Sequence, residues 1–194
     1  MKAGSAASLA LLARLLVANR WDGTPLPADE HAVVEVRWSE HGELLLSVDA
    51  PYYGDVPPSA AAGSTERLWE HEVIEVFFAD AQEHYLEIEL GPHGHYLVLE
   101  LSGVRKAVRR GLPIQYSVSC QLTGALAGEG PIGRFHAVVR VPRAYLPAGV
   151  TRANAYAIHG VGARRCYHAC STLGRAGSAP DFHRLKSFVP ITLR

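Results

Sequence analysis

The fold is decided by the stretch from Leu68 to Gly103, which reads LWEHEVIEVFFADAQEHYLEIELGPHGHYLVLELSG. It contains three short apolar runs rich in β-branched and aromatic residues, at Glu72–Phe78, Tyr85–Leu90 and His95–Leu101. Short polar or Gly/Pro segments connect these runs. Such connections favour antiparallel hairpins, because a parallel return needs a crossover of about a dozen residues. The stretch therefore predicts a three-stranded antiparallel meander.

Side chains that alternate along these strands divide the meander into two faces. We expect one apolar set to point into a core, namely Leu86, Ile88, Leu97 and Leu99. Glu87 and Glu89 alternate with that set and are expected to point outward. Glu75 lies among apolar residues of the first strand, where a carboxylate must be solvated, paired or hydrogen-bonded. The outward face is therefore either a solvated sheet surface or a ligand-binding face.

The rest of the chain supplies further short strands with turn residues at close spacing and almost no helical periodicity. These strands are predicted near Leu15–Trp21, Ala32–Trp38, Leu44–Ala50, Ile114–Leu122, Phe135–Val141, Arg152–His159, Arg165–Ala169 and Asp181–Leu193. Pro142–Pro147 is expected to form one short helical turn, and Pro51–Glu66 a long loop. The pattern predicts an all-β fold, an antiparallel β-sandwich of the jelly-roll kind. We expect residues 1–14 to form an N-terminal extension, helical or irregular, and residues 15–194 to form a single domain.

Composition narrows the classes of function. The formal net charge is +0, from 19 basic and 19 acidic residues, which argues against a general binder of nucleic acid or of anionic membranes. The N-terminal apolar run is interrupted by Arg14 and is too short to span a bilayer. Cys120, Cys166 and Cys170 are an odd number of cysteines, which favours free thiols over a secreted disulfide framework or a zinc site. We therefore expect a cytoplasmic protein.

Two families share motifs with this chain. Leu68–Phe78 followed by Tyr85–Glu89 resembles the signature of the family-nine carbohydrate-binding modules, which are DOMON-like sandwiches, although Glu72 stands where the modules commonly have aspartate. The chain also resembles a family of small intracellular proteins known mostly from animal open reading frames. The motifs that carry this second resemblance are Trp21-Asp22-Gly23, Ala50–Tyr53, Glu87–Leu90 with Pro92–Gly94, Leu101–Gly103, Asn154-x-x-x-Ile158-His159-Gly160 and Pro180–His183. The modules imply a carbohydrate-binding face and sometimes a structural Ca²⁺ ion, whereas the animal family implies no activity.

A saccharide site needs an aromatic surface for C–H packing and planar polar groups for pairs of hydroxyls. The aromatic surfaces we consider are Trp69, Tyr52, Tyr53, Tyr96 and Tyr156, and the hydrogen-bonding groups are Glu75, Glu87, Glu89, Arg140 and Asn154. Trp69 could instead pack in the core where the long loop enters the sheet. We expect a non-catalytic module that binds a saccharide or a similar polyhydroxylated ligand.

Two alternatives remain open. Glu87 and Glu89 could form the catalytic pair of a glycoside hydrolase, because positions i and i+2 of a strand lie about 6.6 Å apart at Cα, which either hydrolytic mechanism tolerates. The aromatic content of 8% favours a binding module over that enzyme. A scaffold without a small ligand is the other alternative.

The ten histidines also raise the question of a metal site. The candidate ligands are His93, His95, His159 and His183, with His71 at the same end of the fold. A hairpin turn explains Pro92-His93-Gly94 more simply, so no metal ligand is assigned.

Overall fold

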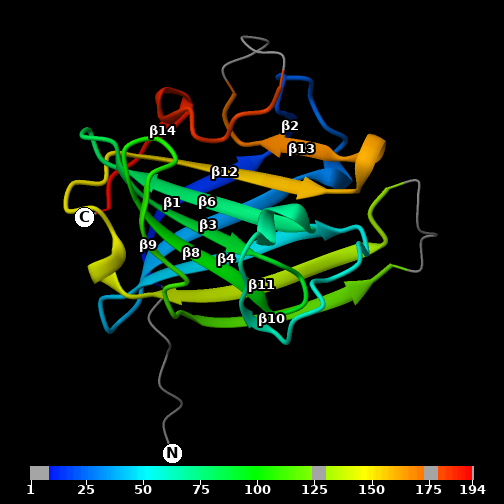
Figure 1. The fold of residues 1–194 in the computed structure, drawn as a ribbon, viewed down its shortest axis with the longest axis horizontal. Helices are drawn as coiled ribbons and strands as arrows, with labels where there is room; N and C mark the ends of the chain where they lie inside the picture. The colour runs from blue at the N-terminus through cyan, green and yellow to red at the C-terminus, as the bar shows by residue number, and fades with distance from the viewer. Residues whose placement is uncertain (1–8, 124–129, 173–178, 194) are drawn as a thin grey trace, which may run out of the picture.

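Two antiparallel β-sheets form the body of the computed structural model, which describes residues 9–123, 130–172 and 179–193. In Figure 1 the sheets lie in two layers, one behind the other. The first sheet has the order β1 (Leu11–Val17), β3 (Ala32–Trp38), β4 (Leu44–Tyr52), β11 (Gly133–Val141), β10 (Gln115–Leu122). The second has the order β2 (Asn19–Arg20), β13 (Cys166–Ala169), β12 (Arg152–His159), β6 (Val73–Ala79), β7 (His84–Leu90), β8 (His95–Ser102), β5 (Gly63–Ser64), with β14 (Val189–Pro190) on β12 and β9 (Ala107–Arg110) on β8. The predicted all-β antiparallel sandwich is confirmed, with one short parallel pairing between β5 and β8.

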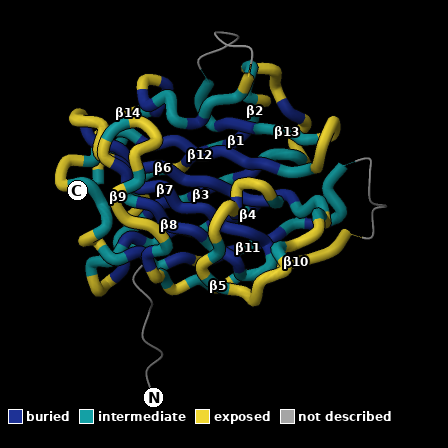
Figure 2. Tube along the Cα trace, in the orientation of Figure 1, coloured by how far each residue is buried: buried dark blue, intermediate teal, exposed yellow. Residues whose placement is uncertain are grey.

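The main core lies between the sheets. Alternate residues of the first sheet, such as Val34, Leu46 and Val139, pack against Val76 and Ile88 of the second. Figure 2 shows the strands around this core as mostly buried, whereas exposed residues are concentrated in the turns and along β10. Alternation along each strand thus assigns one face of the second sheet to this core. The opposite face is called the outer face below.

The meander β6–β7–β8 forms as the sequence predicts, and its turns show why. Asp80 accepts hydrogen bonds through Oδ1 from the backbone N–H groups of Gln82 and His84, at 2.8 and 2.9 Å. This Asx geometry reverses the chain between β6 and β7. Gly94 takes a φ of +86° in the turn between β7 and β8, a value that favours glycine.

The expected facing of β8 is wrong for Leu97 and Leu99. The register pairs Glu87 with Leu99 and Glu89 with Leu97, so these leucines share the outer face with the glutamates. They are buried there in a second apolar cluster, which the C-terminal segment also enters through Phe182. β8 is therefore covered on both faces, whereas Leu86 and Ile88 point into the main core as predicted.

Three further segments differ from the sequence analysis. β1 begins at Leu11, so residues 11–14, which we expected to precede the domain, lie in the first sheet opposite β3. The predicted last strand, Asp181–Leu193, is mostly irregular and contains only the short β14. Residues 1–8 and most of the predicted loops at 124–133 and 171–180 lie outside the described residues.

Helical structure in the described ranges is confined to 3₁₀ turns: η1 (Ala28–Glu30), η2 (Leu68–Glu70), η3 (Arg143–Tyr145), η4 (Gly162–Arg164) and η5 (Leu185–Ser187). The turn η3 confirms the helical turn predicted within Pro142–Pro147. Within those ranges, no helix has the length and apolar character needed to cross a bilayer.

Candidate binding cavity

A cavity of about 400 Å³ opens on the outer face of the second sheet. Its walls come from strands of that sheet, from η2 and from the C-terminal segment. The lining residues are Trp69, Glu75, Glu87, Leu99, Leu101, Arg105, Ala107, Arg110, Ile158, Tyr167, Pro180, Phe182 and His183. A volume of this size is within the range of small-molecule sites.

The register of two strands, β6 and β7, brings the carboxyl groups of the cavity floor together. Glu75 on β6 is paired directly with Glu89 on β7, and Phe77 is paired with Glu87. Because alternate residues share a face, Glu75, Glu87 and Glu89 point to the same side of the sheet. One carboxylate oxygen from each lies within 4.8 Å of the others.

These carboxyl groups are buried without adequate partners. Glu75, Glu87 and Glu89 have relative exposures of 3%, 4% and 0%. Within the described ranges, no hydrogen-bond partner reaches Glu87 Oε2, and the Glu89 carboxylate has only a weak interaction with the backbone N–H of Trp69. Buried polar groups in native proteins are nearly always hydrogen-bonded, so this floor has unused capacity for hydrogen bonds.

Burial also changes the ionisation of the floor. It raises the pKa of Glu87 to about 7, an effect that the guanidinium groups of Arg110 and Arg105 partly offset. Burial and repulsion from Glu87 hold the pKa of Glu75 well above its usual value. The pKa of Glu89 is raised by burial and by repulsion from both other glutamates. The floor therefore keeps protons near neutral pH and offers both hydrogen-bond donors and acceptors.

Two arginines stand at the mouth of the cavity, and each is held by a carboxylate. Arg105 Nη2 lies 2.9 Å from Asp181 Oδ1, and Arg110 Nη2 lies 2.5 Å from Glu66 Oε2. Asp181 also accepts a hydrogen bond from the backbone N–H of His183. The guanidinium groups are thus positioned near the floor while their charges are balanced.

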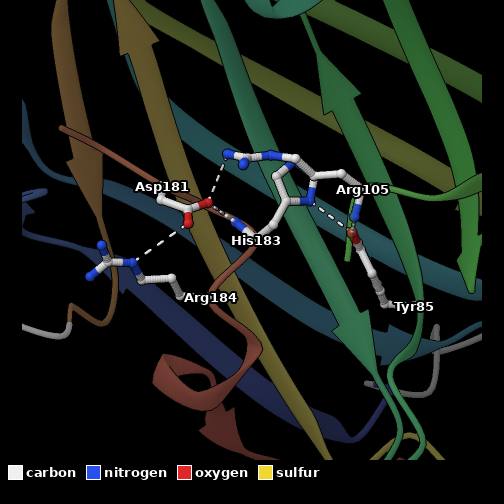
Figure 3. Close-up of polar contacts among 5 residues, drawn as sticks. All are labelled: Tyr85, Arg105, Asp181, His183 and Arg184. Atoms are coloured by element: carbon white, nitrogen blue, oxygen red, sulfur yellow. Dashed lines mark hydrogen bonds and ion pairs between the residues drawn. The ribbon is translucent and has the colours of Figure 1, made fainter. Parts of the chain in front are cut away.

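A hydrogen-bond network ties the C-terminal segment to the sheet at this mouth (Figure 3). The Tyr85 hydroxyl accepts a hydrogen bond from the backbone N–H of Arg105 at 2.8 Å and is also bonded to Nδ1 of His183 at 2.8 Å. Asp181 bridges Arg105 and Arg184 in the same view. Burial, with the charge of Arg105, lowers the pKa of His183 to about 4, so its ring is neutral near neutral pH.

Aromatic side chains supply the apolar part of the cavity. Trp69 on η2 is 36% exposed, and Arg165 donates hydrogen bonds to the carbonyl oxygens of Trp69 and Glu70. Phe182 stacks on Tyr156 with ring centroids 3.9 Å apart. The cavity therefore combines carboxyl groups, guanidinium groups and aromatic surfaces within one volume.

Comparison of the sequence with known proteins places this chain in a family. The chain is 35% identical to the UPF0462 protein C4orf33 homolog of Danio rerio over 188 residues, covering 92% of this chain and 88% of that protein. It is 38% identical to the homolog of Mus musculus over 181 residues, and 35% identical to UPF0462 protein C4orf33 of Homo sapiens over 179 residues, each time covering 89% of this chain. The chain belongs to the UPF0462 family. A scan against protein-family models gives no match.

A solved structure shares the fold of this UPF0462 member. It comes from Bacteroides uniformis and is described as a "putative carbohydrate-binding protein". The superposition has a TM-score of 0.62, with 17% sequence identity, and covers 92% of this chain and 85% of the other. At that identity the likeness establishes the fold alone.

The structure brings together only part of the predicted site. Trp69, Glu75 and Glu87 line the cavity, and Glu89 lies in the floor beside Glu75 and Glu87. Asn154 is on the same face but is fully buried, with its amide bonded to Tyr156 and Ser171.

The other predicted residues lie elsewhere in the fold. Arg140 is on β11 of the first sheet, 3.5 Å from Glu43. Tyr96 faces the main core, where its ring meets Tyr116. Tyr52 contacts His93, and Tyr53 stacks on His159.

Glu72, which lies three residues after Trp69 in the Leu68–Phe78 motif, has a structural role in this UPF0462 chain. Its carboxylate accepts hydrogen bonds from the backbone N–H groups of Tyr53 and Asp55, at 2.7 and 3.1 Å. It therefore fixes the start of the long loop rather than reaching the cavity.

Three lining residues, Arg105, Arg110 and His183, were not assigned to the ligand site from the sequence, and neither was Asp181, which holds Arg105 at the mouth. The arginines belong to a basic connector that is visible in the sequence, and the hairpin of β8 and β9 places one of them, Arg110, opposite Leu99. The C-terminal pair meets Tyr85 and Arg105 across a very long sequence separation. No local pattern signals that contact.

Two groups of side chains among the described residues could hold a metal ion. One is the set of three glutamates, whose oxygens suit Ca²⁺ in kind, although Ca²⁺ takes about 6–8 oxygen ligands. The other is His159, Cys166 and His168. Of the histidines raised from the sequence, His93 contacts Tyr52 and His95 contacts the carbonyl of Ala60.

Proposed function

We propose that this chain binds a saccharide or a similar polyhydroxylated ligand in the cavity on the outer face of the second sheet, without transforming it. The observation that carries the proposal is Glu87, a buried glutamate that lines the cavity and whose Oε2 lacks a hydrogen-bond partner within the described ranges. Leaving such a group unsatisfied costs about 1–3 kcal/mol, so a ligand that satisfies it binds favourably.

The chemistry of the cavity supports a ligand with several hydroxyl groups. A protonated carboxyl donates one hydrogen bond and accepts others, which matches a hydroxyl that does both. Arg105 and Arg110 add donors at the mouth, and Trp69 offers an aromatic surface for the apolar face of a sugar ring. The description of the Bacteroides uniformis protein as carbohydrate-binding supports the same class of ligand.

The test is calorimetric titration of the full chain with a panel of mono- and oligosaccharides, with and without Ca²⁺. We expect at least one saccharide to bind and Glu87→Ala and Trp69→Ala each to weaken its binding by about tenfold or more, which is about 1.4 kcal/mol. Glu35→Ala is the matched control, because Glu35 is a half-exposed carboxylate on the first sheet. If no saccharide binds, or if affinity is the same in all three variants, the proposal is wrong.

A hydrolase is the second candidate, and one observation favours it: a carboxyl with a pKa of about 7 can donate a proton near neutral pH. The expected pair of Glu87 and Glu89 is less suitable than Glu75 and Glu87, because Glu89 is fully buried and does not line the cavity. Turnover of a chromogenic glycoside that disappears in both Glu75→Gln and Glu87→Gln would replace the binding proposal with this one.

A further inference from the structure

A second cluster of chemically reactive side chains lies on the other face of the second sheet. His159 ends β12 and is paired directly with Cys166, the first residue of β13. His168 is two residues further along β13, so it shares a face with Cys166. Tyr167, between them, points to the opposite face and lines the ligand cavity. The cluster is therefore separate from that cavity.

The three side chains are close enough to share one ion. One nitrogen from each imidazole and the sulfur of Cys166 all lie within 4.8 Å of one another. Donors around a tetrahedral zinc ion are about 3.3–3.8 Å apart, given its Zn–N and Zn–S distances. Small side-chain rotations are therefore enough to bring the three donor atoms from within 4.8 Å to the separation that zinc requires. The rings of His159 and His168 already meet edge to face, with centroids 5.0 Å apart.

The imidazole nitrogens lack the partners that a structural histidine normally has. His168 is 1% exposed, and among the described residues no hydrogen-bond partner reaches Nε2 of His168 or of His159. The ring of His159 is held by stacking on Tyr53, with centroids 3.5 Å apart and planes 1° from parallel. Two oriented imidazoles with free nitrogens beside a thiol form a donor set suited to a transition metal.

We propose that His159, Cys166 and His168 bind a zinc-type transition-metal ion through two imidazoles and one thiolate, with a fourth position open to water. Cys166 and His159 are only partly buried, which leaves a path for the ion to enter. The Cys166 thiol now makes only a weak 3.4 Å contact with the carbonyl oxygen of Arg164, so the metal displaces little.

The positive charges around the cluster favour a set of metal ligands that includes the anionic Cys166 thiolate. Arg20 and Arg165 both lie near His159. A divalent ion bound by three neutral ligands would add two positive charges beside them, whereas the Cys166 thiolate reduces the addition to one. Arg165 is also occupied by the carbonyl oxygens of Glu70 and Gly160.

The experiment is a Zn²⁺ titration of the metal-free full chain under reducing conditions, in competition with a chromophoric chelator. We expect one equivalent to bind to the wild-type chain and to Cys170→Ser, and this binding to be lost or weakened at least tenfold in Cys166→Ser. Cys170 is the matched control, because it is a partly buried free thiol directly after β13 and outside the cluster. Trp69→Ala should bind zinc like the wild type, since Trp69 belongs to the cavity.

A second measurement does not depend on any variant. Co²⁺ added to the wild-type chain should give a thiolate-to-cobalt charge-transfer band and the intense ligand-field bands of a four-coordinate site. Absence of the thiolate band, absence of zinc binding, or unchanged binding in Cys166→Ser would overturn the proposal.

Discussion

Glu75 and Glu89 face each other directly across β6 and β7, and both side chains are buried in the middle of the second sheet. Like charges in such a pair destabilise a sheet, and burial penalises each charge further. The pKa of Glu89 is accordingly held well above its usual value by burial and by the charges of Glu75 and Glu87. The cavity floor is therefore a protonated, hydrogen-bonding surface rather than a row of carboxylates.

Replacing Glu89 with glutamine should change how stability depends on pH. The folded chain keeps this proton at pH values where the unfolded carboxyl, with its usual pKa of 4.5, has lost it. The free energy of unfolding therefore decreases as the pH rises above about 4.5. Because glutamine does not ionise, we expect Glu89→Gln to raise the free energy of unfolding by on the order of 1–3 kcal/mol near pH 8. This gain in stability should vanish near pH 4.

Urea denaturation of the ligand-free chain across that pH range measures this effect. Glu35→Gln, outside the cavity, should follow the wild-type pH profile. The interpretation is wrong if Glu89→Gln shows the same pH profile as the wild type.

The Tyr85 hydroxyl should contribute measurably to stability, because it joins two segments that lie far apart in the sequence. Tyr85→Phe removes its hydrogen bonds to Arg105 and His183 and leaves two partly buried partners, the Arg105 N–H and His183 Nδ1, without it. We expect a loss of about 1–3 kcal/mol in the free energy of unfolding. Tyr145→Phe removes a single exposed bond to the carbonyl oxygen of Pro113 and should cost less than about 1 kcal/mol. Equal losses in the two variants, measured by urea denaturation, would contradict the role given to Tyr85.

Gly160 should be essential for the turn that joins β12 to β13. Its φ is +75°, and a Cβ there would lie 2.2 Å from the carbonyl oxygen of Arg164. Gly42 has a φ of +76° but nothing within 4 Å of such a Cβ. Gly42→Ala should therefore cost about 1 kcal/mol from backbone strain alone, and Gly160→Ala several times as much.

Thermal unfolding compares these two glycine variants. Gly160→Ala should also weaken zinc binding, because the turn sets His159 opposite Cys166. A Gly160→Ala chain as stable as Gly42→Ala would show that the turn is not constrained in this way.

Local alternation predicted the meander and the shared face of Glu87 and Glu89, because both follow from strand geometry, whereas the β6–β7 register adds Glu75 to that face. It failed for Leu97 and Leu99, because β8 is apolar on both faces and alternation alone cannot say which face meets the other sheet. The pairing of Glu87 with Leu99 settles the matter, and that register is a property of the hairpin rather than of either strand alone.

Long-range contacts explain the rest of what the sequence did not predict. Arg140 carries a suitable group but lies on β11, whose place in the first sheet no local pattern specifies. His168 could have been found, because it lies two residues after Cys166 in the predicted strand Arg165–Ala169 and so shares a face with it. Asp181 and His183 reach the cavity only through the packing of the C-terminal segment on the second sheet.

The most direct test of the central claim is to map the bound saccharide by amide chemical-shift changes in the isotope-labelled chain. We expect the largest changes in β6, β7, β8 and β9, in η2 and around Asp181–His183, and we expect them to be strongly reduced in Glu87→Ala. Changes concentrated on β3, β4, β10 and β11 of the first sheet, or changes that persist at full size in Glu87→Ala, would contradict the assignment of the ligand to the glutamate-floored cavity.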